Sequence, residues 1–277
     1  MTQPTLNLPP DLASRVHCMR DAASVAAHGT LALFQSDALR VESKGEAGPV
    51  TQADRAAEQS MRAAIAARFP HDGFLGEEYG TQSGTSGFTW VIDPIDGTVS
   101  FASGVPLYGT LLAIEQAQPD GSRRVVAGVC EMPALRERVW AVEGCGAWWE
   151  REGHAPVRAQ VRACADLSQA LVTTTGSEYY RRSNRLPVLA RLEATVGRMR
   201  GWSDCYALML LATGRCDAAI DPVMNPWDCG PFDVIVREAG GVFTDWKGRP
   251  GIHGGDSLAA HAATHAAMLR CIGGASA

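Results

Sequence analysis

The chain has 277 residues, of which 46% are hydrophobic and 20% are charged, with a formal net charge of −5. This composition is ordinary for a globular protein with a large core, and no run approaches the roughly 20 apolar residues of a membrane span. The negative charge and the lack of a basic stripe argue against nucleic acid as a partner. Scattered cysteines without a close Cys-x-x-Cys pair, together with a polar N-terminal segment, favour a cytoplasmic protein with reduced thiols.

Hydrophobic periodicity and turn residues predict the elements of the first half. In chain order these are helices over residues 11–38 and 55–68, separated by a loop at 45–48, and strands near 89–92, 109–116 and 125–132. The segment Gly144-Cys145-Gly146, followed by two tryptophans, indicates a β-hairpin.

The second half continues the alternation of strands and helices. Its expected elements are a strand at 170–174, helices over 186–196 and 206–213, a strand at 218–220 and a helix that follows Asp228. Such alternation is typical of an α/β layered fold. Because no linker or repeat separates the halves, we divide the chain only nominally into an N-terminal half, residues 1–160, and a C-terminal half, residues 161–277.

The most informative segment is residues 90–98, Trp-Val-Ile-Asp-Pro-Ile-Asp-Gly-Thr. An apolar run that predicts a buried strand ends in two carboxylates, Asp93 and Asp96, which the fixed φ of Pro94 holds close together. Gly97 allows a sharp backbone turn toward a ligand. Magnesium prefers oxygen ligands, often a few carboxylates together with substrate phosphates, so the segment indicates a cation site. The same pattern also forms a good turn without any ligand.

Three further acidic motifs lie in comparable places. Glu77 and Glu78 follow a short apolar segment, Asp54 precedes an alanine-rich helix, and Asp228 opens another apolar helix. Each has a structural alternative, because the glutamates could form a solvated turn and both aspartates could be helix N-caps. Only the combination of all these motifs favours a functional site.

Together the motifs resemble the inositol monophosphatase family of Mg²⁺-dependent phosphatases. The matching features are Gly76-Glu77-Glu78, residues 90–98 with Phe101, Pro226-Trp227-Asp228 and Glu238-Ala239-Gly240-Gly241, within a likeness that extends from about Lys44 to Lys247. The resemblance implies alternating α and β layers, an αβαβα sandwich of the inositol monophosphatase/fructose bisphosphatase type, with the metal site between the halves. Because relatives are commonly dimers, it also implies a possible homodimer.

Carried over position by position, the resemblance implies two or three Mg²⁺ ions and a set of ligands. The implied metal ligands are Glu77, Asp93, the backbone carbonyl of Ile95, Asp96 and Asp228. Carboxylates crowded in this way repel each other without metal, so Mg²⁺ should raise the stability of the protein.

The resemblance also implies roles around the phosphate. Asp54, Thr98 and Glu77 form the catalytic set, in which Thr98 and Asp54 orient and deprotonate the attacking water. Gly97 and Thr98 would bring backbone and hydroxyl donors to the phosphate. Lys44 matches a basic residue near the third metal position, and we place Glu78 outside the direct ligands.

Substrate choice depends on the second half of the chain. Residues 202–206 and 221–228 resemble the histidinol-phosphatase branch of the family more than the inositol branch. Asp204 and Asp221, with Ser203 beside them, would offer acceptors for the ammonium and imidazole groups of histidinol phosphate. Asp221 could equally serve a polyol.

We therefore expect a small phosphate ester as the partner, with histidinol phosphate first and inositol 1-phosphate or another small phosphate ester as the alternative. A metal-binding regulatory protein of the same fold, without turnover, is the alternative from another class. Intact carboxylates at all the expected positions argue against that alternative.

Two segments depart from the family pattern or receive no role. Cys229-Gly230-Pro231-Phe232 stands where small residues are usual. Because proline is accepted in a first helical turn, we expect the helix there to start slightly later. Residues 176–180 fall where substrate-contacting loops occur in relatives, and no role is assigned to them.

Overall fold

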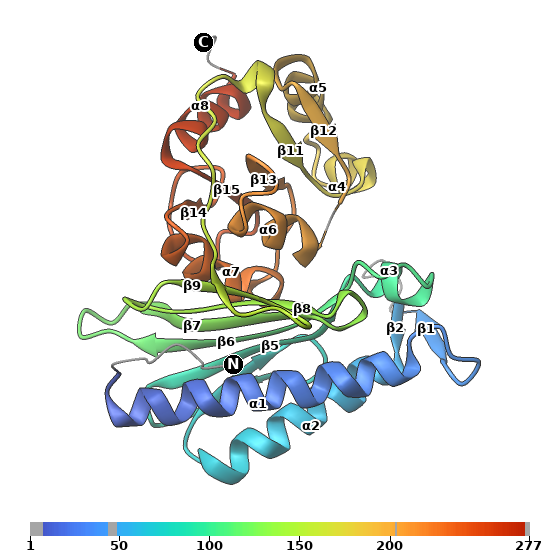
Figure 1. Ribbon diagram of the computed structural model, residues 1–277, viewed down its shortest axis with the longest axis vertical. Helices are drawn as coiled ribbons and strands as arrows, with labels where there is room; N and C mark the ends of the chain where they lie inside the picture. Colours follow the sequence, from blue (N-terminus) through green and yellow to red (C-terminus); the bar gives the residue numbers. More distant parts are fainter. Residues whose placement is uncertain (1–7, 44–48, 203, 275–277) are drawn as a thin grey trace.

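The structure of the protein, a computed structural model, describes residues 8–43, 49–202 and 204–274. Helical and sheet layers alternate along its long axis (Figure 1). An eight-stranded and a five-stranded sheet form the β layers, and helices α6 (Cys205–Ala212) and α7 (Pro226–Glu238) lie between them. Other helices cover the outer face of each sheet, so the expected αβαβα sandwich is confirmed.

The larger sheet is antiparallel except for one pair, β3 beside β5. Its spatial order is β10 (Val157–Arg158), β9 (Ala147–Arg151), β8 (Glu137–Val142), β7 (Arg123–Met132), β6 (Gly109–Ala117), β5 (Phe88–Asp96), β3 (Gly73–Gly76) and β4 (Gly80–Gln82). The expected tryptophan hairpin is confirmed as β8 and β9. A separate short pair, β1 (Val41–Ser43) with β2 (Pro49–Thr51), lies beside the short helix α3 (Thr98–Ala102).

Helices α1 (Pro10–Leu33) and α2 (Gln52–Arg68) cover one face of this sheet (Figure 1). Fully buried Met61 and Trp90 belong to the core that they share with the strands. A buried ion pair also ties α1 to the sheet, because Arg15 Nη2 lies 2.7 Å from Asp72 Oδ1 and Arg15 Nε lies 2.8 Å from Asp72 Oδ2.

Helix α1 is shorter than the 11–38 range expected from the sequence. Phe34, which follows its last residue, adopts an extended conformation. Its ring lies 5.0 Å from that of Tyr108 and 5.7 Å from that of Phe101. Packing of this ring in a small core of its own ends the helix, and local sequence periodicity does not report such a contact.

The inner helix α7 packs on the opposite face of the larger sheet. The expected late start of this helix is wrong, because it begins at Pro226 and holds Pro231 in its interior. That proline lacks the N–H that the carbonyl of Trp227 would otherwise receive. It is accommodated by Gly128 of β7, where an added Cβ would lie 2.6 Å from the Pro231 Cα.

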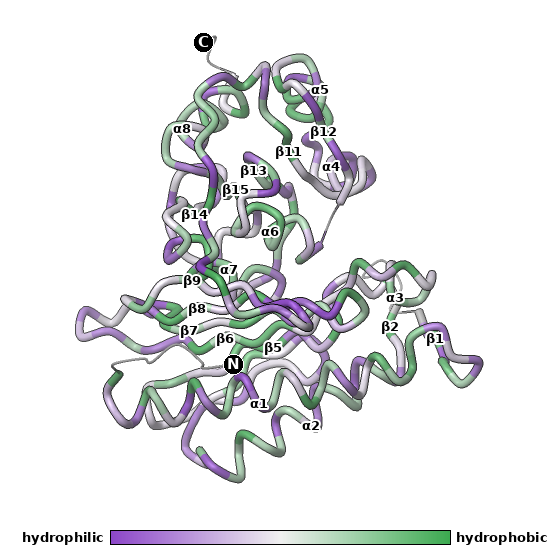
Figure 2. The backbone as a smooth tube through the Cα atoms, viewed as in Figure 1, coloured by the Kyte–Doolittle hydropathy of each residue, from purple (hydrophilic) through white to green (hydrophobic). Residues whose placement is uncertain are grey.

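The smaller sheet has parallel pairs on one side and antiparallel pairs on the other. Its order is β12 (Arg198–Arg200), β11 (Leu171–Thr173), β13 (Ala218–Asp221), β15 (Ser257–Ala260) and β14 (Val242–Thr244), with α4 (Ser177–Arg182), α5 (Leu186–Thr195) and α8 (Ala262–Gly273) around its outer side. Hydrophobic residues concentrate on the strands and on α6 (Figure 2). Among the described helices, none has the length and apolar character needed to cross a membrane.

Candidate active site

A β-bulge brings two carboxylates to one face of the sheet. On β5, Asp93 pairs with Leu111 and Asp96 with Gly109, so three residue steps on β5 match two on β6. In a regular strand, residues three apart point to opposite faces, and the extra residue reverses the second one. The Thr110 hydroxyl donates to the Pro94 carbonyl at 2.9 Å and holds the bulge.

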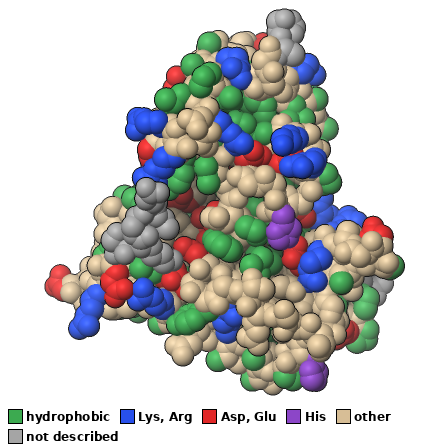
Figure 3. Space-filling model, turned by 180° about the vertical axis from the view of Figure 1, so that it is seen from behind, with side chains coloured by type: hydrophobic (Ala, Val, Ile, Leu, Met, Phe, Trp, Pro, Cys, Tyr) green, Lys and Arg blue, Asp and Glu red, His purple; other side chains and the backbone are tan. Residues whose placement is uncertain are grey.

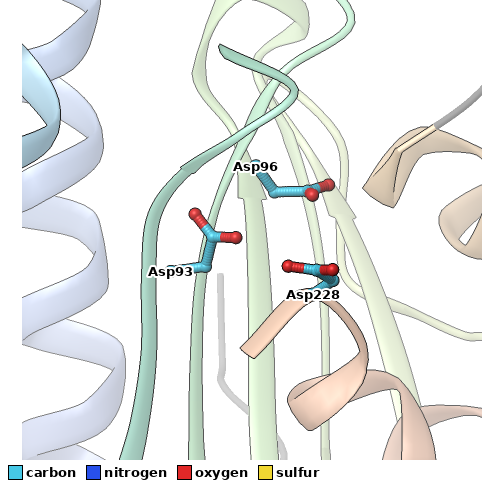
Figure 4. Close-up of side chains that lie close together, drawn as sticks. All are labelled: Asp93, Asp96 and Asp228. Atoms are coloured by element: carbon cyan, nitrogen blue, oxygen red, sulfur yellow. The ribbon is translucent and has the colours of Figure 1, made fainter. Parts of the chain in front are cut away.

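The third carboxylate comes from the start of α7. Asp228 is the third residue of this helix, and its Oδ2 accepts the Asn225 backbone N–H at 2.7 Å in a capping box. The carboxylates of Asp93, Asp96 and Asp228 point toward one space (Figure 4), and each offers an oxygen within 4.8 Å of the others. Asp228 therefore lies beside Asp93 and Asp96 although it is far from them in the sequence, as predicted.

Glu77 reaches the same place through strand pairing. Strand β3 runs parallel to β5 with Gly76 opposite Ile92, and the Glu77 N–H donates to the Ile92 carbonyl at 3.2 Å. Parallel pairing brings the ends of both strands to one edge. The charge of Glu77 contributes to a raised pKa at both Asp93 and Asp228, which places it beside them.

The electrostatics of this cluster favour a bound cation. Burial first, and neighbouring carboxylates second, raise the pKa of Asp93 and of Asp96 well above the usual range, and burial raises the pKa of Asp228 to about 7. Asp93 Oδ1 is buried with no hydrogen-bond partner among the described residues. Hard cations take such carboxylate oxygens, so these residues fit a divalent metal ion. Acidic side chains line a hollow between the two parts of the molecule (Figure 3).

Asp54 and Thr98 form a second group at the edge of the cluster. Asp54 is the third residue of α2, and its Oδ2 accepts the Thr51 N–H at 2.7 Å in another capping box. Its Oδ1 lies 3.4 Å from the Thr98 hydroxyl oxygen, which lies 3.1 Å from the Ile95 carbonyl oxygen. Burial raises the pKa of Asp54, so it can hold a proton closer to neutral pH than an exposed aspartate.

Gly97 makes this geometry possible. Its φ is +86°, in the left-handed region that favours glycine. A Cβ at this position would lie 2.9 Å from Asp204 Oδ2 and 3.0 Å from the Leu107 carbonyl oxygen. The backbone turn between Asp96 and Thr98 therefore requires glycine for conformation and for space.

Asp204 and Asp221 approach the cluster from the smaller sheet and the inner helices. The Cys205 N–H donates to Asp96 Oδ2, which joins the start of α6 to β5. Asp221 ends β13 and accepts the Thr175 N–H at 2.7 Å. Burial raises the pKa of Asp204 to about 6 and that of Asp221 to about 7, and the charge of Asp204 contributes to the shift at Asp221.

Asp204 has a strained backbone. Its φ of 56° and ψ of −153° lie in a region that is almost restricted to glycine, at a cost of about 1–3 kcal/mol. Such strain persists only where the surrounding structure holds the residue in place, and it clusters at functional sites. The predicted residues Lys44 and Ser203 lie outside the described residues.

Several residues of the site were missed by the sequence analysis. Thr51 and Asn225 complete the capping boxes of Asp54 and Asp228, and the three-residue spacing of each pair was the available signal. Tyr179 of α4 is half-buried, and the charges of Asp204 and Asp228 contribute to its raised pKa after burial. It therefore lies beside the site, in the segment that received no role. Glu78 lies near enough to Asp54 to contribute to its raised pKa.

The layers and the converging carboxylates define an α/β sandwich protein with an acidic site that can hold a metal ion. Residues 12–273 match the sequence model of the inositol monophosphatase family. The chain therefore belongs to that family, whose members depend on metal. Two solved structures are similar over nearly the whole chain. Extragenic suppressor protein suhB from Bartonella henselae is 28% identical with a TM-score of 0.83, covering 94% of this chain and 98% of that one. An inositol monophosphatase from Zymomonas mobilis is 28% identical with a TM-score of 0.81, covering 96% and 100%.

Relatives with assigned activities are similar in sequence. A histidinol-phosphatase from Chlorobaculum parvum is 42% identical over 86% of this chain and 88% of its own length. Another from Streptomyces coelicolor is 37% identical over 91% and 93%. An inositol-1-monophosphatase from Rhizobium meliloti is 34% identical over 76% and 77%.

Proposed function

We propose that the chain is a Mg²⁺-dependent phosphomonoesterase that converts histidinol phosphate to histidinol and phosphate. The observation that carries the proposal is the convergence of Asp93, Asp96 and Asp228, with an unpartnered buried oxygen on Asp93. Glu77 and the Ile95 carbonyl complete the proposed ligands, for two or three Mg²⁺ ions. Bound Mg²⁺ would neutralise phosphate oxygens and lower the pKa of the attacking water.

The protein groups around the proposed metal ligands have separate tasks. Asp54 and Thr98 would orient the water, and Asp54 would take its proton, because burial raises the pKa of this carboxyl. The backbone N–H groups of Gly97 and Thr98 would hold phosphate oxygens. Glu78 would not bind the metal directly. Its charge would instead help to raise the pKa of the nearby Asp54 carboxyl.

The choice of histidinol phosphate rests on Asp204 and Asp221 and on the relatives. Both carboxyls are largely buried beside the cluster, and a cation next to them would favour their ionised form. An ammonium group makes charge-assisted hydrogen bonds with such acceptors, and an imidazole N–H can also donate to them. The strained backbone of Asp204 supports a functional demand at this position. Histidinol-phosphatases at 37–42% identity are more similar to the chain than the inositol-1-monophosphatases at 31–34%.

Inositol 1-phosphate is the second candidate, because Asp221 can also accept hydrogen bonds from hydroxyl groups. The two substrates differ in charge, so replacement of an acidic residue separates them. Hydrogen bonds to charged groups contribute roughly 1.5–3 kcal/mol, which corresponds to about tenfold or more in affinity.

The experiment measures phosphate release from both esters at pH 8 with saturating Mg²⁺, with an EDTA-treated control. We expect a higher kcat/KM for histidinol phosphate than for inositol 1-phosphate. Asp204→Asn should lower the ratio of the first kcat/KM to the second by about tenfold. Asp217→Asn is a matched control, because Asp217 is buried just before β13 but is paired with Arg162. A preference for inositol 1-phosphate would overturn the proposed substrate. No Mg²⁺-dependent release from either ester would overturn both substrates and favour another phosphate ester or a regulatory protein without turnover.

A further inference from the structure

A buried carboxylate outside the proposed ligands holds the loop that carries Glu77. Glu58 lies in the middle of α2, and its exposed fraction is 0%. We propose that Glu58 is a positioning residue, which fixes the Glu77 loop and thereby sets the affinity of the site for Mg²⁺. This inference rests on the proposed function, because it assumes that Glu77 is a metal ligand.

Both oxygens of Glu58 are engaged at the loop. Oε2 accepts the Glu78 N–H at 2.7 Å, and Oε1 accepts the Tyr79 N–H at 3.3 Å. Oε1 also accepts Arg62 Nε at 2.7 Å, and Arg62 Nη2 donates to the Gly80 carbonyl at 2.5 Å. The carboxylate and its arginine therefore fasten the three residues that directly follow Glu77.

Gly76 shows how closely the carboxylate approaches the other side of Glu77. A Cβ on Gly76 would lie 2.0 Å from Glu58 Oε1 and 2.6 Å from its carboxyl carbon. A side chain at position 76 would therefore collide with the carboxylate of Glu58. The glycine before Glu77 is required by the position of Glu58, since its φ is not in the left-handed region.

Helix α2 also connects two parts of the site, through Asp54 and Glu58. Asp54 and Glu58 are four residues apart on α2, so they project from the same face of one helix. Asp54 faces Thr98, whereas Glu58 faces the loop of Glu77. One rigid helix thus determines the position of the proposed proton acceptor relative to a proposed metal ligand. Mutation of a residue that orients a metal ligand in this way commonly lowers metal affinity by about 10- to 100-fold.

The test uses Glu58→Gln in the full chain and measures Mg²⁺ binding by titration calorimetry, independently of turnover. The amide keeps the size of the side chain but presents an NH₂ group to one of the N–H donors that the carboxylate accepts. We expect the Kd for Mg²⁺ to rise by about tenfold or more, while the KM for the ester at saturating Mg²⁺ stays within about twofold.

A matched control separates positioning from general loss of stability. Glu115 is also a buried carboxylate, but it pairs with Arg123 and His253 and takes no part in the proposed site. Glu115→Gln should lower stability and leave the Kd for Mg²⁺ unchanged. If Glu58→Gln also leaves that Kd within about twofold of the wild type, Glu58 is only a structural residue and the inference is wrong.

Gly76→Ala tests the same contact from the other side and covers the case in which Glu58→Gln does not fold. Its methyl group should displace Glu58 and weaken Mg²⁺ binding to a similar extent. In the double variant Gly76→Ala/Glu58→Ala the collision with the carboxylate is gone, and the next closest atom, Arg62 Nη2 at 2.8 Å, is the end of a flexible side chain that can move away. Mg²⁺ should therefore bind no more weakly than to Glu58→Ala. Additive losses would contradict the inference. A wild-type protein that binds no Mg²⁺ would instead count against the proposed function itself.

Discussion

Replacement of Asp228 by asparagine should separate the effect of the acidic cluster on stability from its effect on activity. Asparagine has nearly the same shape as aspartate, and its oxygen can still accept the Asn225 N–H that Asp228 Oδ2 accepts at 2.7 Å. The capping box and the start of α7 should therefore persist. What the variant lacks is a negative charge near those of Glu77 and Asp204, which both contribute to the raised pKa at this position.

The magnitude follows from that pKa. Burial, with its neighbours, raises the pKa of Asp228 from 3.8 to about 7. At 1.36 kcal/mol per pH unit, keeping this group ionised at pH 8 costs the folded state on the order of 4 kcal/mol. Burial of the amide takes back part of the gain, so metal-free Asp228→Asn should be more stable than the wild type by about 2–3 kcal/mol at pH 8.

Urea denaturation with EDTA, at pH 8 and at pH 5, measures this difference. The gain should be clear at pH 8 and small at pH 5, where Asp228 of the wild type is protonated. Added Mg²⁺ should stabilise the wild type and not the variant, and phosphate release should fall by at least about a hundredfold. A variant that is less stable than the wild type at pH 8, or that keeps most of its turnover, would refute the reasoning.

Three other predictions concern the rest of the molecule. Without metal, stability should fall as the pH rises from about 4 to about 7, because Asp221 and Asp228 bind protons more tightly folded, with pKa values of about 7, than unfolded, near 3.8; a urea midpoint that rises from pH 5 to pH 8 would contradict this. Asp72→Asn should cost about 3 kcal/mol of unfolding free energy, because it removes the buried carboxylate that pairs with Arg15 and leaves, among the described residues, only the exposed Asp11 as its ion-pair partner; the Mg²⁺ Kd of the folded protein should not change, and a changed Kd would show that this pair acts on the site. Asp204→Gly should relieve backbone strain, so its thermal midpoint should equal or exceed that of Asp204→Asn while the preference for histidinol phosphate is lost; a lower midpoint for the glycine variant would remove the argument from strain.

Much of the fold could be predicted because its elements have strong local signals. The apolar alternation of β5 to β7 and the glycines of the β8–β9 hairpin specify those elements within the chain itself. The end of α1 could not be predicted in this way, because it depends on the ring of Phe34 packing against Tyr108. The interior position of Pro231 depends on Gly128, a residue of a distant strand. The division near residue 160 stays a prediction.

The sequence indicated which carboxylates belong to the candidate site, but not their geometry or the residues that support them. Asp93 and Asp96 are three apart on a strand, and only the bulge against β6 brings them to one face. Glu58 belonged to no recognisable motif, because the role proposed for it depends on a contact with a loop about 20 residues away along the chain. The strain at Asp204 likewise exists only in the folded chain. Such contacts are set by tertiary structure, which a single sequence does not display.

The position of the metal tests the central claim most directly. Crystals of the protein soaked with Mn²⁺, which takes similar oxygen ligands and scatters X-rays anomalously, would locate it. The account predicts an anomalous peak within coordination distance of Asp93, Asp96 and Asp228. Manganese bound elsewhere, with the three carboxylates free of metal, would contradict it.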